Sequence, residues 1–282
     1  MRYFWLNFHV NYACRHSGAC CSACWPIPVE RHRVMQIQQV SNHADWLVPT
    51  TGAPDDIAGR LAFGPAGHCV FHGDPGCEVY SMRPASCAHF PYVCLIDQRG
   101  VHVTLSHYCP TAASMLFDHD GPTAIVAGRS PVPEFDPREG LDARDALPPL
   151  ASPSRLMSFD DFASWEENTV RTVGAHMAPR VAWPEATQDL EDICGRLVAP
   201  AWQAFEPVIA RYLAAKAFAS WAAYLNDDGT AAVLCGVEAA RAVLQVEAAR
   251  QCARADRILD APLLKEAIRQ SDLLLVHCQA SV

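Results

Sequence analysis

The sequence predicts a mainly α protein in which a loop-rich, cysteine-rich metal-binding domain packs against a C-terminal helical bundle. Three observations support this prediction. Nine of the thirteen cysteines lie between Cys14 and Cys109, six prolines interrupt the segment Ser130 to Arg155, and alanine-rich apolar stretches follow it. We therefore expect a metal- or iron-sulfur-binding domain over 1–128, a proline-rich connector over 129–157 and a helical domain over 158–282.

The N-terminal part is too often broken by glycine and proline to form long helices. Within it, Val101 to Leu105 alternates between apolar and polar residues and predicts a strand. Pro84 suits the first position of a helix, which would place Cys87 in the first turn. There the helix dipole, together with Arg83, would favour the thiolate form of Cys87.

The region after the connector predicts a series of helices. Ser158 to Asp161 resembles a capping box and opens a helix that extends to about Val173. Pro207 would begin or kink a helix rather than lie at its middle. Further helices are expected over Leu190 to Val198, Ala201 to Leu225, Ala231 to Ala253 and Leu263 to His277. Four scattered cysteines are expected to pack in the core as small apolar residues, namely Cys194, Cys235, Cys252 and Cys278.

Composition narrows the classes of partner and compartment. The formal charge is -9, and Lys216 and Lys265 are the only lysines, so no basic surface for nucleic acid is expected. No run approaches the roughly 18 apolar residues that a membrane helix requires, and the N-terminus lacks the pattern of a signal peptide. We expect a cytoplasmic protein that binds neither nucleic acid nor membrane and whose partners are small molecules or proteins.

The cysteine-rich segment ACRHSGACCSACW, from Ala13 to Trp25, allows three explanations. A disulfide framework requires an oxidising compartment, which nothing in the sequence indicates. A catalytic cysteine with a histidine base would account for only one thiol, although five histidines lie near cysteines: His16, His68, His72, His89 and His107. Metal binding accounts for the set and is therefore favoured.

The spacing of the thiols bears on the type of metal. Structural zinc usually comes with two local CxxC pairs, and here only Cys21 and Cys24 form such a pair. An iron-sulfur cluster takes four thiolates that can come from separate loops, so the irregular spacing favours a cluster. The sequence does not identify the four ligands.

Two blocks of sequence resemble the YkgJ-like family of cysteine-cluster proteins, which is described as a zinc- or iron-chelating domain. Cys14-Arg-His-Ser17-Gly-Ala-Cys20-Cys21 resembles its CxxCxxCC motif, with Ser17 in place of the second cysteine. Cys77-Glu-Val-Tyr80-Ser-Met-Arg83-Pro84-Ala-Ser-Cys87 is similar to its second block. The metal ligands implied by this resemblance are Cys14, Cys20, Cys21, Cys69, Cys77, Cys87 and Cys109.

The chain also resembles the related flagellin lysine-N-methylases, in its Cys20-Cys21 pair followed by Trp25 and in its helical C-terminal region. The motif-level resemblance covers about residues 8 to 112. It implies a [4Fe-4S] cluster and S-adenosylmethionine-dependent methyl transfer onto lysines of a protein substrate. Neither a GxGxxG fingerprint nor a CxxxCxxC motif is present. The alternatives are a zinc-binding structural or metal-buffering module without catalysis, and a redox or electron-transfer protein.

Overall fold

The computed structural model describes residues 1–23, 25–65, 67–74, 76–131, 140–177, 188–225 and 227–277. Its contacts divide the chain into two compact units. The smaller unit is Ala13–Phe90, and the larger combines Met1–Tyr12 with Pro91–Val282. The domain ranges expected from the sequence remain a prediction.

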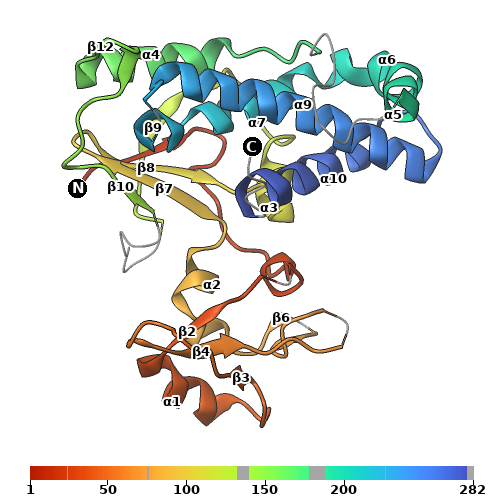
Figure 1. Cartoon of the computed structure of the whole chain (residues 1–282). Coiled ribbons are helices and arrows are strands. Elements are labelled where there is room, and N and C mark those ends of the chain that lie inside the picture. The colour runs from red at the N-terminus through yellow and green to blue at the C-terminus, as the bar shows by residue number, and fades with distance from the viewer. Residues whose placement is uncertain are drawn as a thin grey trace. The chain divides into compact units, whose positions relative to one another are not determined.

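A five-stranded mixed sheet organises the larger unit (Figure 1), with the strand order β10-β7-β8-β1-β9. The strands are β1 (Tyr3–Leu6), β7 (Tyr92–Asp97), β8 (Gly100–Leu105), β9 (Ile125–Gly128) and β10 (Leu141–Asp142). β7 and β8 form an antiparallel hairpin, and β1 lies parallel to β8 and antiparallel to β9. The strand expected at Val101 to Leu105 is confirmed as β8.

The prediction of a mainly α protein is wrong, because the chain is mixed α/β with several sheets. The other strands of the central sheet were not predicted, for a physical reason. Four of the six residues of β7 are buried, so polar–apolar alternation carries little information there. β1 pairs with β8 across about a hundred residues of sequence, and no local pattern indicates such a pairing.

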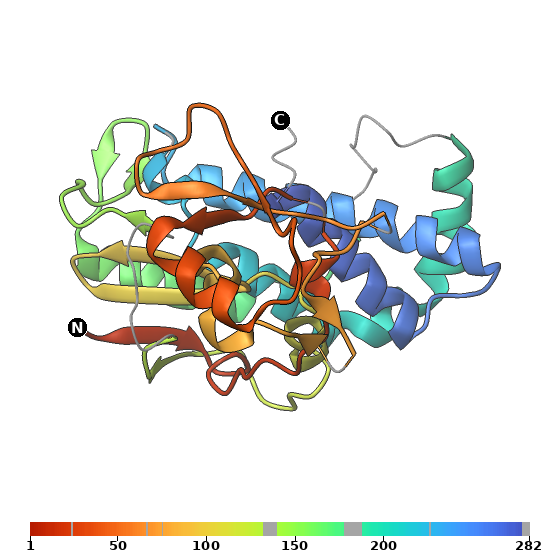
Figure 2. The same ribbon diagram turned by 90° about the horizontal axis from the view of Figure 1, so that it is seen from below.

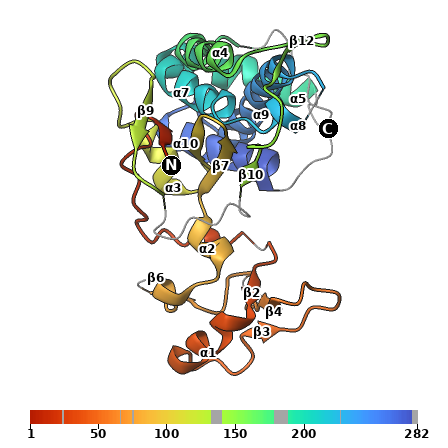
Figure 3. The ribbon, with the colours of Figure 1, turned by 90° about the vertical axis from the view of Figure 1, so that its left-hand side faces the viewer.

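Helices cover one face of this sheet, where α4, α7 and α9 lie together (Figure 3). Ser158 caps α4 as expected, since its side chain accepts a hydrogen bond from the Asp161 N–H. Pro207 lies in the first turn of α7. The helices of this unit are α3 (Pro110–Met115), α4 (Phe159–Thr172), α5 (Gln188–Ile193), α6 (Ala199–Trp202), α7 (Glu206–Ala217), α8 (Ala222–Leu225), α9 (Thr230–Ala255) and α10 (Ala261–Asp272).

Shorter elements complete the larger unit. A π-helical turn follows α5 and another follows α10, a 3-10 turn leads into α7, and a small hairpin precedes α4. These are η4 (Cys194–Val198), η6 (Leu273–His277), η5 (Gln203–Phe205), β11 (Leu150–Ser152) and β12 (Arg155–Leu156).

A buried polar network ties α7 and α10 to the end of β8. The Asp272 carboxylate accepts hydrogen bonds from the Tyr212 hydroxyl at 3.0 Å and from the His107 backbone N–H at 2.6 Å. It also pairs with the Lys216 ammonium at 2.5 Å and with His107 Nδ1 at 3.2 Å. Burial alone would raise the pKa of Asp272, but Lys216 and His107 outweigh it and hold the pKa well below its usual range.

The smaller unit has a three-stranded sheet in the order β2-β4-β3, and α1 packs beside β2 and β4 (Figure 2). The elements are η1 (Ala19–Cys21), β2 (Pro28–Glu30), α1 (Arg31–Val40), β3 (Leu47–Val48), β4 (Ile57–Leu61), β5 (His72–Gly73), β6 (Gly76–Cys77), η2 (Tyr80–Met82) and α2 (Ala85–His89). Its buried apolar cluster includes Trp46 and Phe71, and two cysteines, Cys21 and Cys69, belong to it.

The scattered cysteines follow the packing prediction in two cases. Cys194 and Cys252 are buried in the core of the larger unit, whereas Cys235 is exposed on α9, contrary to the expectation. Cys278 lies outside the described residues. Among the helices that the structure describes, none combines the length and apolar character needed to cross a bilayer.

The Asp272 network gives a stability prediction. Asp272→Asn leaves the Lys216 ammonium, which is only 15% exposed, without its counter-charge and should cost about 3–5 kcal/mol of unfolding free energy, measured by urea titration. Because the pKa of Asp272 is depressed, its contribution is present above the unfolded pKa of about 3.9 and is lost as the pH falls below it.

The matched control is Asp142→Asn, which breaks the exposed pair between Asp142 and Arg144. Such a pair is worth about 0–1 kcal/mol. Equal losses for Asp272→Asn and Asp142→Asn would contradict the role assigned to the buried network.

Candidate metal centre

Five of the predicted cysteine ligands converge within the smaller unit, and they come from four separate backbone segments. Cys20 and Cys21 lie in η1, with their sulfur atoms 3.8 Å apart. The Cys21 thiol is also within hydrogen-bonding reach of Cys69 and Cys77. Cys87, in α2, is close enough to sense the charges of Cys20, Cys69 and Cys77. Sulfur is the donor type that these five side chains share.

The local backbone explains how the adjacent residues Cys20 and Cys21 can both belong to one thiol group. Gly18 adopts a left-handed conformation with a φ of 73° and leads into the single turn of η1. The Cys69 N–H then donates to the Cys21 carbonyl oxygen at 2.7 Å, which fastens the second cysteine segment to the first. Cys77 follows Gly76 in the short hairpin of β5 and β6, where it pairs with His72.

Interactions among the thiols give them different pKa values. The hydrogen bond between the Cys20 and Cys21 thiols raises the pKa of Cys21 and lowers that of Cys20. The pKa of Cys77 falls to about 7, first because of its interaction with the Cys21 thiol and then because the Val79 N–H and Arg83 act in the same direction against burial. Interaction with the Cys21 thiol lowers the pKa of Cys69 as well. Thiolates, the form that binds metal, are therefore favoured at three of the five positions.

Cys87 departs from the prediction that the helix dipole and Arg83 favour its thiolate. Pro84 is the N-cap residue of α2, and Cys87 does lie in the first turn. Burial nevertheless raises the pKa of Cys87, the neighbouring thiols raise it further, and Arg83 offsets only part of that rise.

The remaining predicted ligands lie elsewhere. Cys14 is exposed, and its sulfur accepts a hydrogen bond from the His16 backbone N–H at 3.4 Å. Cys109 belongs to the larger unit, where it is the N-cap residue of α3 and its sulfur lies 3.4 Å from the Tyr12 hydroxyl. Both stay predictions as ligands. Cys24 lies outside the described residues, and Cys94 is buried in β7, where burial raises the pKa of its thiol to about 12.

Aromatic and cationic side chains surround the thiols. The His16 ring lies 4.3 Å from the Tyr80 ring, and the Arg83 guanidinium lies over the same ring at 4.0 Å. The rings of His68 and His72 are stacked 5.3 Å apart. The sequence indicated that these residues lie near the cysteines, but it could not indicate the stacking.

One side of the thiol group opens on a cavity of about 410 Å³. Cys77 lines this cavity together with His16, Asp74 and Glu78. A metal bound by Cys77 would therefore have a route to solvent or to a small ligand.

The donor set fits a thiophilic metal, because several thiols meet within a small unit and share their protons. The sulfur atoms are hydrogen-bonded to one another rather than arranged as a formed coordination sphere. Within the described parts of the chain, no three His, Cys, Asp or Glu side chains have that arrangement. Metal binding thus requires small rotations of the short cysteine side chains.

Comparison with known families agrees with this site. Residues 13–110 match a family model described as "CxxCxxCC: Putative zinc- or iron-chelating domain". This match supports metal binding by the CxxCxxCC region, our name for residues 13–110, which contains all seven predicted cysteines. Neither a curated protein nor a solved structure matches the chain. The relationship to lysine-N-methylases finds no support in these comparisons.

The backbone beside Cys20 offers a test of the site. A Cβ atom at Gly18 would lie 2.1 Å from His72 Nε2, so Gly18→Ala must displace either η1 or the His72 ring. We expect a lower melting temperature and less bound metal per chain, measured by thermal unfolding and by elemental analysis.

Gly52→Ala is the matched control, because Gly52 has the same φ of 73°. Its chain neighbours aside, a Cβ atom added there would meet no atom of the described residues within 4 Å. Backbone strain is thus common to both variants, and the collision with His72 is specific to Gly18→Ala. Indistinguishable metal contents would show that the packing of Gly18 against His72 does not shape the site.

Proposed function

We propose that the Ala13–Phe90 unit binds one metal ion, zinc or iron, through the four thiolates of Cys20, Cys21, Cys69 and Cys77. The separation of 3.8 Å between the sulfur atoms of Cys20 and Cys21 carries this proposal. In a tetrahedral site with metal–sulfur bonds of about 2.3 Å, any two sulfur atoms lie about 3.8 Å apart. Cys69 and Cys77 also interact with Cys21, so these four thiols belong to one group.

An iron-sulfur cluster, the [4Fe-4S] type above all, is the second candidate. Each thiolate of such a cluster binds a different iron, so the ligand sulfurs lie farther apart than around a single ion. The fifth thiol favours this candidate, because Cys87 is close to Cys20, Cys69 and Cys77 and has no place in a four-sulfur site. With Cys87 as a ligand, Cys20 or Cys21 would be released from the set.

The cavity beside Cys77 supports a site that exchanges metal or ligand rather than a sealed structural site. When bound, a metal there would supply Lewis-acid or electron-transfer chemistry, while His16, Asp74 and Glu78 would contact the incoming molecule. The modification of a protein substrate with S-adenosylmethionine, implied by the resemblance to lysine-N-methylases, remains a further proposal that depends on the cluster.

The ligand assignment predicts the effect of two substitutions made together. Cys21→Ser with Cys77→Ser should remove most of the bound metal and lower the melting temperature of the smaller unit, because two of four thiolates are lost. Zinc, iron and acid-labile sulfide would be measured on the same anaerobically purified sample.

Two controls separate the possibilities. Cys94→Ser, in β7, should leave the metal content unchanged. Cys87→Ser should leave a mononuclear site intact but should reduce iron and sulfide if a cluster is present. Full metal content in the Cys21→Ser, Cys77→Ser variant would refute the proposed ligand set.

A further inference from the structure

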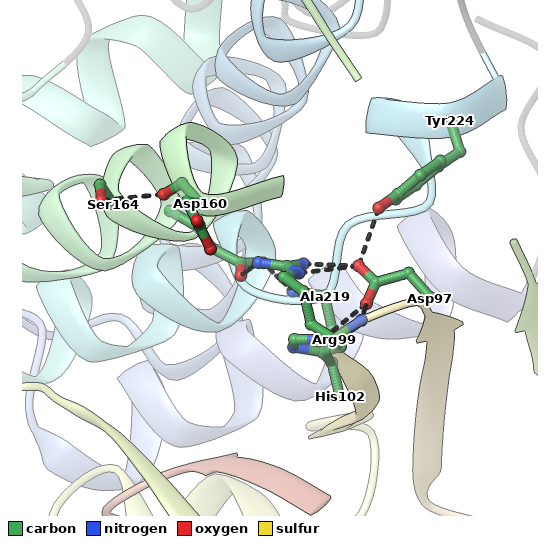
Figure 4. A network of polar contacts seen from close by, with 8 residues as sticks. Asp97, Arg99, His102, Asp160, Ser164, Ala219 and Tyr224 are labelled. Carbon is green, nitrogen blue, oxygen red and sulfur yellow. Dashed lines mark hydrogen bonds and ion pairs between the residues drawn. The ribbon is translucent and has the colours of Figure 1, made fainter. Parts of the chain in front are cut away.

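A second site, in the larger unit, is built around the buried carboxylate of Asp97. Asp97 accepts hydrogen bonds from Arg99 Nε at 2.9 Å and from Arg99 Nη2 at 2.7 Å. It also accepts from the Tyr224 hydroxyl at 2.8 Å and from His102 Nε2 at 3.2 Å. Figure 4 shows Arg99, His102 and Tyr224 converging on Asp97, with Asp160 on α4 nearby. The proposed thiolate site uses none of these residues.

These contacts leave a basic nitrogen without a partner. The Asp97 carboxylate can only accept, so in the neutral His102 ring the proton lies on Nε2 and Nδ1 carries the lone pair. His102 is 3% exposed, and its Nδ1 has no hydrogen-bond partner among the residues that the structure describes. Such a buried acceptor is costly unless a donor reaches it.

A cavity of about 660 Å³ adjoins this network, and His102 and Arg99 line it. Phe4 and Ile125 contribute apolar surface, and the exposed acids Asp160 and Glu167 contribute negative charge. The volume falls within the range of about 300–1,000 Å³ that is typical of sites for small molecules or side chains.

The charge of the site favours a cation. The Arg99 guanidinium is already neutralised within the protein, since it pairs with Asp97 and also with Glu166 at 2.9 Å. Four carboxylates, those of Asp97, Asp160, Glu166 and Glu167, face two guanidinium groups, those of Arg2 and Arg99. Two negative charges therefore remain unbalanced when His102 is neutral.

We propose that this cavity binds an alkylammonium group, either the side chain of a lysine in a peptide or a free aliphatic amine. The methylene chain would pack against Phe4 and Ile125, and the ammonium would pair with Asp160 and Glu167. The same ammonium would donate an N–H to His102 Nδ1. One ligand class thus satisfies the apolar wall, the excess negative charge and the unpartnered nitrogen.

Calorimetric titration of the full chain with three probes tests this proposal. Butylamine and a peptide with a single lysine should bind, whereas butanol, which lacks the charge, should not. Tighter binding of the peptide would identify a peptide as the source of the amine, and equal or tighter binding of butylamine would identify a free amine. Raising the salt concentration should weaken both interactions.

Variants locate the site. Glu167→Gln and Asp160→Asn should each weaken amine binding roughly two- to fivefold, because each removes one exposed carboxylate. Glu191→Gln, an exposed acid on α5 outside the cavity, should have no effect. In protein labelled with ¹⁵N-histidine, the Nδ1 resonance of His102 should shift on addition of butylamine; the His102→Gln variant assigns that resonance.

Three results would overturn the proposal. These are no binding of either amine, binding of butanol as strong as that of butylamine, or amine binding that is equal in Glu167→Gln and Glu191→Gln. Magnesium, titrated alone, provides the last test. Binding of magnesium that is weakened in Glu167→Gln, without any binding of amine, would identify the cavity as a metal site.

Discussion

The small hydrophobic core of the Ala13–Phe90 unit is the constraint on which its structure depends. A core in a unit of roughly 70–80 residues rarely contributes more than about 3–5 kcal/mol. Here two of the buried residues are the thiols Cys21 and Cys69, so the centre of the unit is also the centre of the metal site. Apolar burial and metal binding therefore act on the same few atoms, and loss of either weakens the other. The backbone hydrogen bond from the Cys69 N–H to the Cys21 carbonyl oxygen links these two cysteines and therefore contributes to both effects.

The larger unit is stabilised instead by a sheet, a layer of helices and buried ion pairs. The carboxylates of Asp272 and Asp97 each interact with a basic side chain and a tyrosine hydroxyl, and each belongs to a network that spans several elements. At Asp272 the chain of hydrogen bonds continues from His107 to His9, whose Nε2 lies 3.2 Å from His107 Nε2. Burial lowers the pKa of both histidines, so that chain holds neutral rings and no extra buried charge.

The sequence predicted some features of the fold well because they depend on local signals. The capped start of α4 at Ser158 needs only a hydroxyl and a helical pattern, and Pro207 suits only the first turn of α7. The five-stranded sheet depends instead on the pairing of β1 with β8 and of β10 with β7, which no local pattern indicates. The same limit applies to the cysteines. Their spacing predicts metal ligands as a class, but the exposure of Cys14 and the placement of Cys109 depend on tertiary structure.

The polar network around Asp97 was missed for a related reason. Asp97 ends β7 and Arg99 lies in the two-residue turn between β7 and β8, and a charged pair at a hairpin turn is ordinarily a solvated surface feature. Only the packing of α4 and α8 over that turn, through Glu166 and Tyr224, buries the pair and gives it partners. The two sites of this chain then differ in chemistry as well as in position. Thiolates of the smaller unit suit soft metal ions, whereas carboxylates and one imidazole of the larger unit suit a hard cation or an ammonium. A cation that binds tightly at one site is accordingly a weak ligand for the other, which allows the two sites to take different ligands from the same solution.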